Sequence, residues 1–266
     1  MSPASGTEPA PPIWTLPPAP PRQRALGRTE IVAAAIGLAD DEGAPAVTMK
    51  AVAGRLGSYS PMALYRYVHS KDGLVDLMLD AATAAVPVPG QPGPSWRADL
   101  EALAAQTRQM TQRHPWYPVL FHTRPPAGPH MMKRLEFMLA VLTGQGVSTA
   151  SAMTYAALID RHILGSGLQE AEEARMSRRY GLDDAAGLAA GLAEMHRLAT
   201  AGDFPLLAGW LARPEGQSPE EQFELGLRFL LDGITVRLSR PRRQWRGRRA
   251  RPADGSSRGL GRRASG

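Results

Sequence analysis

Apolar positions recur every three or four residues along most of this 266-residue chain, which is the spacing of helices with one buried face. Near the start of this pattern, Ile31, Ala35 and Leu38 follow the helical spacing, and Gly43 stands where a helix would stop. The pattern predicts a first helix over residues 26–42 and, continued along the chain, an all-α fold.

Two shorter helices are predicted directly after the first. Thr48 can cap the second helix, in which Val52 and Leu56 form the buried face. Ser60 can cap the third helix, because Pro61 then occupies the first helical position, where its missing N–H costs nothing. Two short helices joined by a glycine-containing turn are typical of a helix-turn-helix.

The third predicted helix has two different faces. At 100° per residue, its inward side holds Leu64, Tyr67 and Val68, and its outward side holds Met62, Arg66 and His69, flanked by Ala63 and Tyr65. Small residues, hydroxyls, cations and an apolar group are what a helix needs to contact bases and phosphates in a major groove. The pattern therefore favours a DNA-reading helix over an ordinary amphipathic helix with one wet face.

The remaining pattern predicts a helix from Lys71 to about Ala85, another from Trp96 to about Gln112, and a long helix over 149–170. The segment HPWYPVLFHTRPP, after that second helix, contains too many prolines for a regular helix, and we expect it to form a turn over a cavity. We expect residues 171–185 to be a flexible loop.

Near the C-terminus, AAGLAAGLAEMHRLATAG and SPEEQFELGLRFLLDGITVRL are predicted to be helices. The predicted organisation is a Pro-rich disordered extension (1–23), a helix-turn-helix domain (24–85), a linker (86–95), a ligand-binding and dimerisation domain (96–239) and a disordered Arg-rich tail (240–266).

Composition narrows the possible functions. The chain has no cysteine, which excludes disulfides, thiolate nucleophiles and cysteine-based zinc sites. No apolar run approaches the roughly 20 residues of a membrane span, and the N-terminus lacks the pattern of a signal peptide, so we expect a cytoplasmic protein with no membrane partner.

The net charge of +6 comes from the tail. From Arg240 onward there are ten Arg and one Asp, which gives +9, so residues 1–239 carry 6 − 9 = −3. Such a tail could lie along phosphates without reading sequence, or be a solvated extension with no specific task. A non-specific DNA-compacting protein that uses this tail is one alternative function.

The run VTMKAVAGRLG…SPMALYRYVHSKDGLVDLMLDA resembles the DNA-binding domain of the TetR family, in which LY-x-x-V/F-x-x-K-x-x-L follows the glycine turn. Leu64, Tyr65, Val68, Lys71 and Leu74 match that pattern, although the turn GSYS is one residue longer than the usual form. The resemblance and the outward face together predict that operator DNA is contacted by Thr48, Lys50, Ser60, Met62, Ala63, Tyr65, Arg66 and Lys71.

The second half is similar to the regulatory domain of the tetracycline repressor subgroup, in the stretches HTRPP, LEFMLAVL, GQGVS and LGSGLQEAE. The resemblance implies a homodimer held by the helix at 149–170 and the final helix, and a repressor released by a small molecule. Positions that bind magnesium and tetracycline in that subgroup are Leu120, Leu103 and Met138 here, so we expect a more apolar effector. Its predicted pocket residues are Leu103, Met110, Trp116, Leu120, Met138 and Tyr155.

No cofactor, metal or catalytic residue is predicted. His114, His122 and His130 are eight residues apart in sequence, which is not the spacing of a metal site. An Asp160–His162 pair on the long helix could do acid–base chemistry, so a small-molecule enzyme remains an alternative, as does a ligand-responsive activator.

Overall fold

The computed structural model describes residues 13–16, 26–57, 59–123, 127–181 and 185–239. These residues form eleven α-helices and two 3-10 turns without any strand, so the all-α prediction is confirmed. In chain order the elements are η1 (Ile13–Thr15), α1 (Arg28–Glu42), η2 (Ala44–Ala46), α2 (Met49–Arg55), α3 (Pro61–Val68), α4 (Lys71–Ala84), α5 (Trp96–Arg113), α6 (Trp116–Thr123), α7 (Pro129–Thr143), α8 (Thr149–Tyr180), α9 (Ala185–Ala201), α10 (Pro205–Ala212) and α11 (Pro219–Leu238). None of the helices so described is long and apolar enough to cross a membrane.

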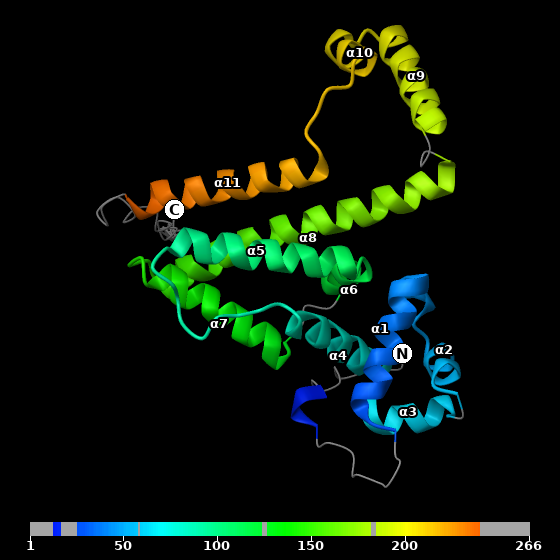
Figure 1. Cartoon of the computed structure of the whole chain (residues 1–266), viewed down its shortest axis with the longest axis vertical. Coiled ribbons are helices and arrows are strands. Elements are labelled where there is room, and N and C mark those ends of the chain that lie inside the picture. Colours follow the sequence, from blue (N-terminus) through cyan, green and yellow to red (C-terminus); the bar gives the residue numbers. More distant parts are fainter. Residues whose placement is uncertain (1–12, 17–25, 58, 124–126, 182–184, 240–266) are drawn as a thin grey trace, which may run out of the picture.

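Helices α1 to α4 form one end of the molecule, which we call the head (Figure 1). Their inward residues include Ile31, Val52, Leu64 and Val68, each with no measurable exposure. Helices α2, α3 and α4 begin at capping side chains, because the hydroxyls of Thr48, Ser60 and Ser70 each accept a hydrogen bond from the backbone N–H three residues later, at 2.8 to 3.3 Å. Local sequence signals therefore set the bounds of this helix-turn-helix.

Part of the predicted disordered extension is packed against the head. The side chain of Ile13 is 2% exposed, and a Cβ added at Gly73 on α4 would lie 3.0 Å from Ile13 Cδ1. Burying one isoleucine is worth about 1.5–3 kcal/mol, which favours packing of this short segment despite the prolines around it. The rest of the extension, residues 1–12 and 17–23, lies outside the described residues, as do residues 24 and 25 and the tail at 240–266.

Helices α5 to α8 and α11 form the second part of the molecule, which we call the sensor body. Helix α8 packs against α5, α6, α7 and α11, and α4 of the head packs against α6 and α7. Its core includes Leu100, Met138, Leu142, Ile159 and Leu231, all 1% exposed or less. The head is therefore joined to the sensor body along α4.

The proline-rich segment after α5 is a helix rather than the expected turn. Helix α6 runs from Trp116 to Thr123, and Pro118 is its third residue. The prediction was wrong because the first-turn N–H groups of a helix have no partner within it, so a proline there removes no hydrogen bond. Tyr117 and Phe121 on α6 both face an internal cavity, as the segment was expected to do.

Helix α8 is longer than predicted, and residues 171–180 continue it instead of forming a loop. Alanine, glutamate and arginine in this stretch favour helix, and Gln169 donates a hydrogen bond of 2.8 Å to Glu173 one turn later. The helix ends at Gly181, whose φ of 65° lies in the left-handed region that glycine adopts readily. The charged residues of this segment therefore belong to an exposed helix and not to a loop.

Helices α9 and α10 pack on each other and stand apart from the rest of the molecule in Figure 1; we call them the hairpin. Helix α10 was not predicted. The hairpin exposes large apolar side chains, which are Leu188, Met195, Leu198, Phe204, Leu206, Leu207 and Trp210. Helix α11 then returns along α8, and it begins with a capping box in which Ser218 and Glu221 bond to each other's backbone N–H.

Candidate nucleic-acid interface and internal cavity

Helix α3 presents a polar and apolar face to solvent. Met62 is 72% exposed and Tyr65 is 37% exposed, whereas Leu64 and Val68 behind them are fully buried. The eight residues predicted to contact DNA all lie on α2 or α3, at the N-cap of one of these helices, or at the start of α4. All are exposed except the half-buried Ala63. This arrangement leaves the outward side of α3 free of the chain's own interior, which a DNA-reading helix requires.

Two contacts hold the helices behind this face. Arg55 at the end of α2 forms an ion pair of 2.7 Å with Asp41 on α1. Arg28 at the start of α1 donates through Nε to the carbonyl oxygen of Tyr67 on α3, at 3.1 Å. Because both contacts reach across to α1, the position of α3 relative to α2 is fixed within the head.

The sensor body encloses a small cavity against α4. Its volume is about 10 Å³, which is room for about one water molecule. A typical small-molecule site measures roughly 300–1,000 Å³, so the helices around this cavity must move apart before such a ligand fits. The lining residues come from five helices and are Thr83, Thr107, Met110, Tyr117, Phe121, Met131, Arg134, Asp160 and Leu164.

A buried ion pair crosses the cavity. Arg134 on α7 is 2% exposed and donates through Nη2 to Asp160 on α8, at 2.7 Å. Its Nε also donates to the hydroxyl of Thr107 on α5, at 3.2 Å. A buried charge is tolerated only when it is paired and hydrogen-bonded, and these two contacts meet that condition.

A second polar contact joins the head to the cavity wall. The hydroxyls of Thr83 on α4 and Tyr117 on α6 are 2.9 Å apart. Thr83 donates its own hydrogen to the carbonyl of Leu79 at 2.8 Å, so Tyr117 is the donor between the two hydroxyls. Burial raises the pKa of Tyr117 to about 12, so this side chain stays neutral and keeps its donor at physiological pH.

The cavity lining differs from the predicted pocket. Of the six predicted residues, only Met110 lines the cavity. Leu103 and Met138 are core residues, Leu120 and Tyr155 pack at the edge of the core, and Trp116 points toward the head. The pocket predicted from the sequence did not include Arg134. The sequence does hold a signal for it, since an arginine four residues before Met138 falls on the apolar stripe of its helix.

Asp40, near the end of α1, accepts hydrogen bonds from two rings of the sensor body. Its Oδ1 lies 2.7 Å from His114 Nδ1 and 2.6 Å from the indole Nε1 of Trp116. The rings of His114 and Trp116 also contact each other, with centroids 5.4 Å apart. We call this group the first joint; it connects the head to the corner between α5 and α6.

Asp80 on α4 makes the second joint. Its carboxylate accepts hydrogen bonds from the backbone N–H groups of His130 (2.9 Å) and Met131 (3.4 Å) and lies 2.7 Å from His130 Nδ1. It thereby caps the first turn of α7, whose N-cap residue Gly128 has no side chain to do so. A Cβ at Gly128 would overlap this carboxylate, so glycine is required for its close approach.

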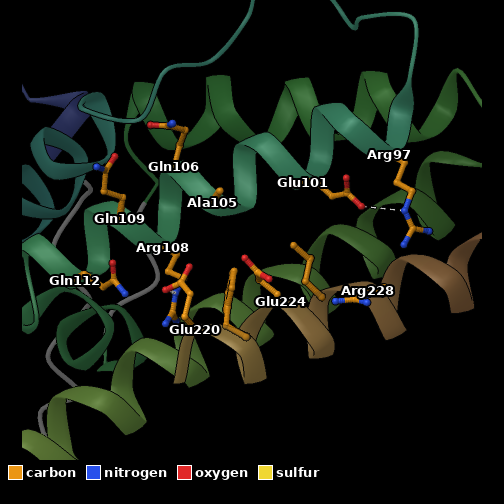
Figure 2. Close-up of a pocket in the computed structure, with 12 residues that line it drawn as sticks. Arg97, Glu101, Ala105, Gln106, Arg108, Gln109, Gln112, Glu220, Glu224 and Arg228 are labelled. Atoms are coloured by element: carbon orange, nitrogen blue, oxygen red, sulfur yellow. Dashed lines mark hydrogen bonds and ion pairs between the residues drawn. The ribbon is translucent and has the colours of Figure 1, made fainter. Parts of the chain in front are cut away.

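A wider groove of about 660 Å³ lies between α5 and α11 (Figure 2). Arg108 on α5 points into it, forms ion pairs with Glu170 (2.6 Å) and Glu220 (3.3 Å), and lies over the ring of Phe223. The groove is lined by charged and amide side chains that include Glu101, Gln109 and Arg228. Two ion pairs, Arg108–Glu220 and Arg97–Asp232, join the two helices at this groove.

The residues of the alternative acid–base pair have different partners. Asp160 bonds to Arg134, whereas His162 Nε2 lies 2.8 Å from the carbonyl oxygen of Phe223 on α11. Within the described part of the chain, no group of three His, Cys, Asp or Glu side chains is arranged to hold a metal ion.

Comparison with known proteins agrees with this architecture. The family model described as tetracyclin repressor-like, C-terminal domain, matches residues 88–238. An HTH-type transcriptional regulator of Saccharopolyspora erythraea is 34% identical over 225 residues, which is 84% of this chain and 91% of the relative. The HTH-type transcriptional repressor DrrR1 of Streptomyces coeruleorubidus is 32% identical over 213 residues, 80% of this chain and 78% of the relative.

Solved structures show the same fold. The crystal structure of apo ActR from Streptomyces coelicolor superposes with a TM-score of 0.67 at 23% identity, covering 82% of this chain and 98% of ActR. The curated relatives, the family match and the helix-turn-helix with its exposed α3 agree with one another. The chain belongs to the TetR family of helix-turn-helix transcriptional regulators.

Proposed function

We propose that this regulator is a repressor that binds an inverted-repeat operator as a homodimer and leaves it when a small molecule opens the cavity. The observation that carries the proposal is the pairing of an exposed α3 face with a cavity whose wall includes Thr83 of α4, the helix directly after α3. Repression is supported by the relative at 32% identity, which is named a repressor.

The DNA contacts divide into two kinds. Met62 and Ala63, in the first turn of α3, face base edges, and Tyr65 and Arg66 follow them along the exposed side. The remaining predicted contacts, which are Thr48, Lys50, Ser60 and Lys71, lie around this turn and contact phosphates. The first kind supplies sequence preference, and the second sets orientation on the duplex.

Dimerisation is supported by apolar side chains left exposed on the sensor body and the hairpin. Helix α8 exposes Met153 and Leu158, and α11 exposes Phe229 and Val236. Several large apolar side chains exposed on two helices that pack together are typical of protein interfaces. A two-fold dimer through α8 and α11 presents two α3 helices to successive major grooves, about 34 Å apart on one side of the duplex.

The effector enters the cavity between α4 and α8. ActR, which has this fold, has been crystallised with actinorhodin. The cavity of this chain combines aromatic and methionine side chains with the Arg134–Asp160 pair and two hydroxyls. We therefore expect an effector with an apolar body and a few polar groups, which agrees with the more apolar effector that the sequence predicts. As a DNA-binding regulator, the protein would act in the cytoplasm.

The proposal is tested by selecting duplexes from a random DNA pool with the full chain. The expected result is enrichment of one inverted repeat that shifts in a gel at nanomolar protein and competes against random DNA. A variant lacking residues 240–266 should keep the same sequence preference. It should lose only the non-specific part of the affinity, which decreases steeply as the salt concentration rises. If no common sequence is enriched, or if the variant without the tail loses its sequence preference, the proposal that α3 recognises the operator sequence is contradicted.

A further inference from the structure

We propose that the two joints transmit occupancy of the cavity by a ligand to the head. The first joint is Asp40 with His114 and Trp116, and the second is Asp80 with His130 and the first turn of α7. This inference rests on the proposed function and names its coupling residues. In both joints a carboxylate of the head accepts hydrogen bonds from a histidine ring and from at least one further N–H of the sensor body. Asp40 and Asp80 act as positioning residues, since neither lines the cavity or lies on the exposed face of α3.

The first reason is the chain position of the joint residues. Trp116 in the first joint precedes Tyr117, which lines the cavity, and His130 in the second joint precedes Met131, which also lines it. Adjacent residues of a helix point about 100° apart, so one side chain meets the cavity while its neighbour meets the head. A ligand that displaces Tyr117 or Met131 must therefore move Trp116 or His130 as well.

The second reason is that the cavity cannot admit a ligand without such a movement. With a volume of about 10 Å³, it gains space when its lining helices separate, and the proposed movement is that of α6 and α7 away from α4, α5 and α8. Those two helices carry Trp116 of the first joint and His130 of the second, and His114 lies between α5 and α6. Their displacement is passed to α1 through Asp40 and to α4 through Asp80, and α1 and α4 both pack against α3.

The third reason is that the hydrogen bonds of each joint are short and have one enclosed partner. Trp116 is 2% exposed and Asp80 is 3% exposed, and the missing side chain of Gly128 makes room for the Asp80 carboxylate. Charge-assisted hydrogen bonds of 2.6 to 2.9 Å in such surroundings resist separation more than exposed ion pairs do. Motion of α6 and α7 is then transmitted to the head instead of being lost at the contact.

Coupling between two sites is reciprocal, so it can be measured from the DNA side without knowing the effector. The probe is the duplex selected by the full chain, and the readout is amide hydrogen exchange in α6 and at the start of α7. In the wild-type chain, saturating duplex is expected to slow exchange in both segments. Asp80→Asn should abolish the response at the start of α7 and keep that of α6, and Asp40→Asn should do the opposite, while both variants still bind the duplex.

Asp41→Asn is the matched control. Asp41 is next to Asp40 but pairs with Arg55 inside the head, so both exchange responses should persist in this variant. If either joint variant fails to fold, Trp116→Phe and His130→Ala test the same contacts from the sensor body, because the first keeps an aromatic ring and the second removes a half-exposed one.

The outcomes separate the two proposals. Responses that persist in all four joint variants, or a wild-type chain that binds the duplex tightly without any change in α6 or α7, would overturn the role of the joints. Failure of the wild-type chain to select any duplex would instead overturn the proposed function.

Discussion

Thr83 on α4 and Tyr117 on α6 share a buried hydrogen bond of 2.9 Å at the wall of the cavity. This contact joins α4, the helix that follows α3, to α6, the helix that the proposed effector would displace. Burial raises the pKa of Tyr117 to about 12, above its ordinary value of 10.0. The folded chain therefore holds this proton over a pH range in which the unfolded chain releases it.

The Tyr117 contact predicts a loss of stability at alkaline pH. Between pH 10 and 12 the unfolded state binds fewer protons at this site than the folded state, so the free energy of unfolding falls as pH rises, by up to about 1.4 kcal/mol per pH unit. Tyr117→Phe should remove this part of the slope in urea titrations, at a cost near neutral pH of about 1 kcal/mol for the lost hydrogen bond. Tyr180→Phe, at an exposed tyrosine, should leave the slope unchanged.

The Arg134–Asp160 pair predicts that substitutions of its two residues have strongly non-additive effects on the free energy of unfolding. Asp160→Ala leaves the buried guanidinium without its partner and should destabilise the fold by about 3 kcal/mol, near the low end for buried pairs because Asp160 is itself partly exposed. The double variant Arg134→Met with Asp160→Leu should lose less than either single variant, since no charge is then left unpaired. Urea unfolding of the wild type, the single variants Arg134→Met and Asp160→Leu, and the double variant provides the test, and additive losses would argue against the pair.

The helix-turn-helix was predicted well because its signals are local. The capping hydroxyls of Thr48 and Ser60 and the inward residues Leu64 and Val68 all act within one or two helical turns of sequence. The predicted bounds of helix α8 were too short. Its last residues are charged and exposed, and a sequence alone does not distinguish such residues from those of a loop.

The cavity and the joints could not be predicted in the same way. The cavity lining comes from α4, α5, α6, α7 and α8, so its composition depends on how five helices pack. The bonds of Asp80 to His130 and of Asp40 to Trp116 join residues 50 and 76 positions apart. Neither helical periodicity nor capping rules relate such distant residues, and a single sequence offers no other measure of their proximity.

The exposed face of α3 predicts that Met62 can be changed without unfolding the head. Met62→Asp places a carboxylate at the proposed groove contact, and affinity for the selected duplex should fall about 10- to 100-fold, the cost of one or two lost base contacts. Because Met62 is 72% exposed, the melting temperature should stay unchanged. Met132→Asp, at an exposed methionine of α7, should affect neither quantity.

The apolar surface of α11 predicts the oligomeric state. Phe229 is 65% exposed in the single chain, and Phe229→Asp should raise the dimer dissociation constant about a thousandfold, because each of two copies loses about 2 kcal/mol of apolar burial. Sedimentation velocity over a range of concentrations measures this change. Arg228→Asp adds a carboxylate one residue away on the groove side and should remain dimeric; equal dissociation of both variants would place the interface elsewhere.

The packing of Ile13 predicts that a segment flanked by prolines contributes to stability. Ile13→Ala removes most of a side chain that is 2% exposed and should lower the free energy of unfolding by about 2 kcal/mol, at the low end for buried isoleucine because the segment can partly close the space. Removal of residues 1–12 keeps Ile13 and is the control, with little expected effect. Since Ile13 packs beside Gly73 in the first turn of α4, the same variant should speed amide exchange there, whereas a loss of stability without that change would mean that the contact lies elsewhere.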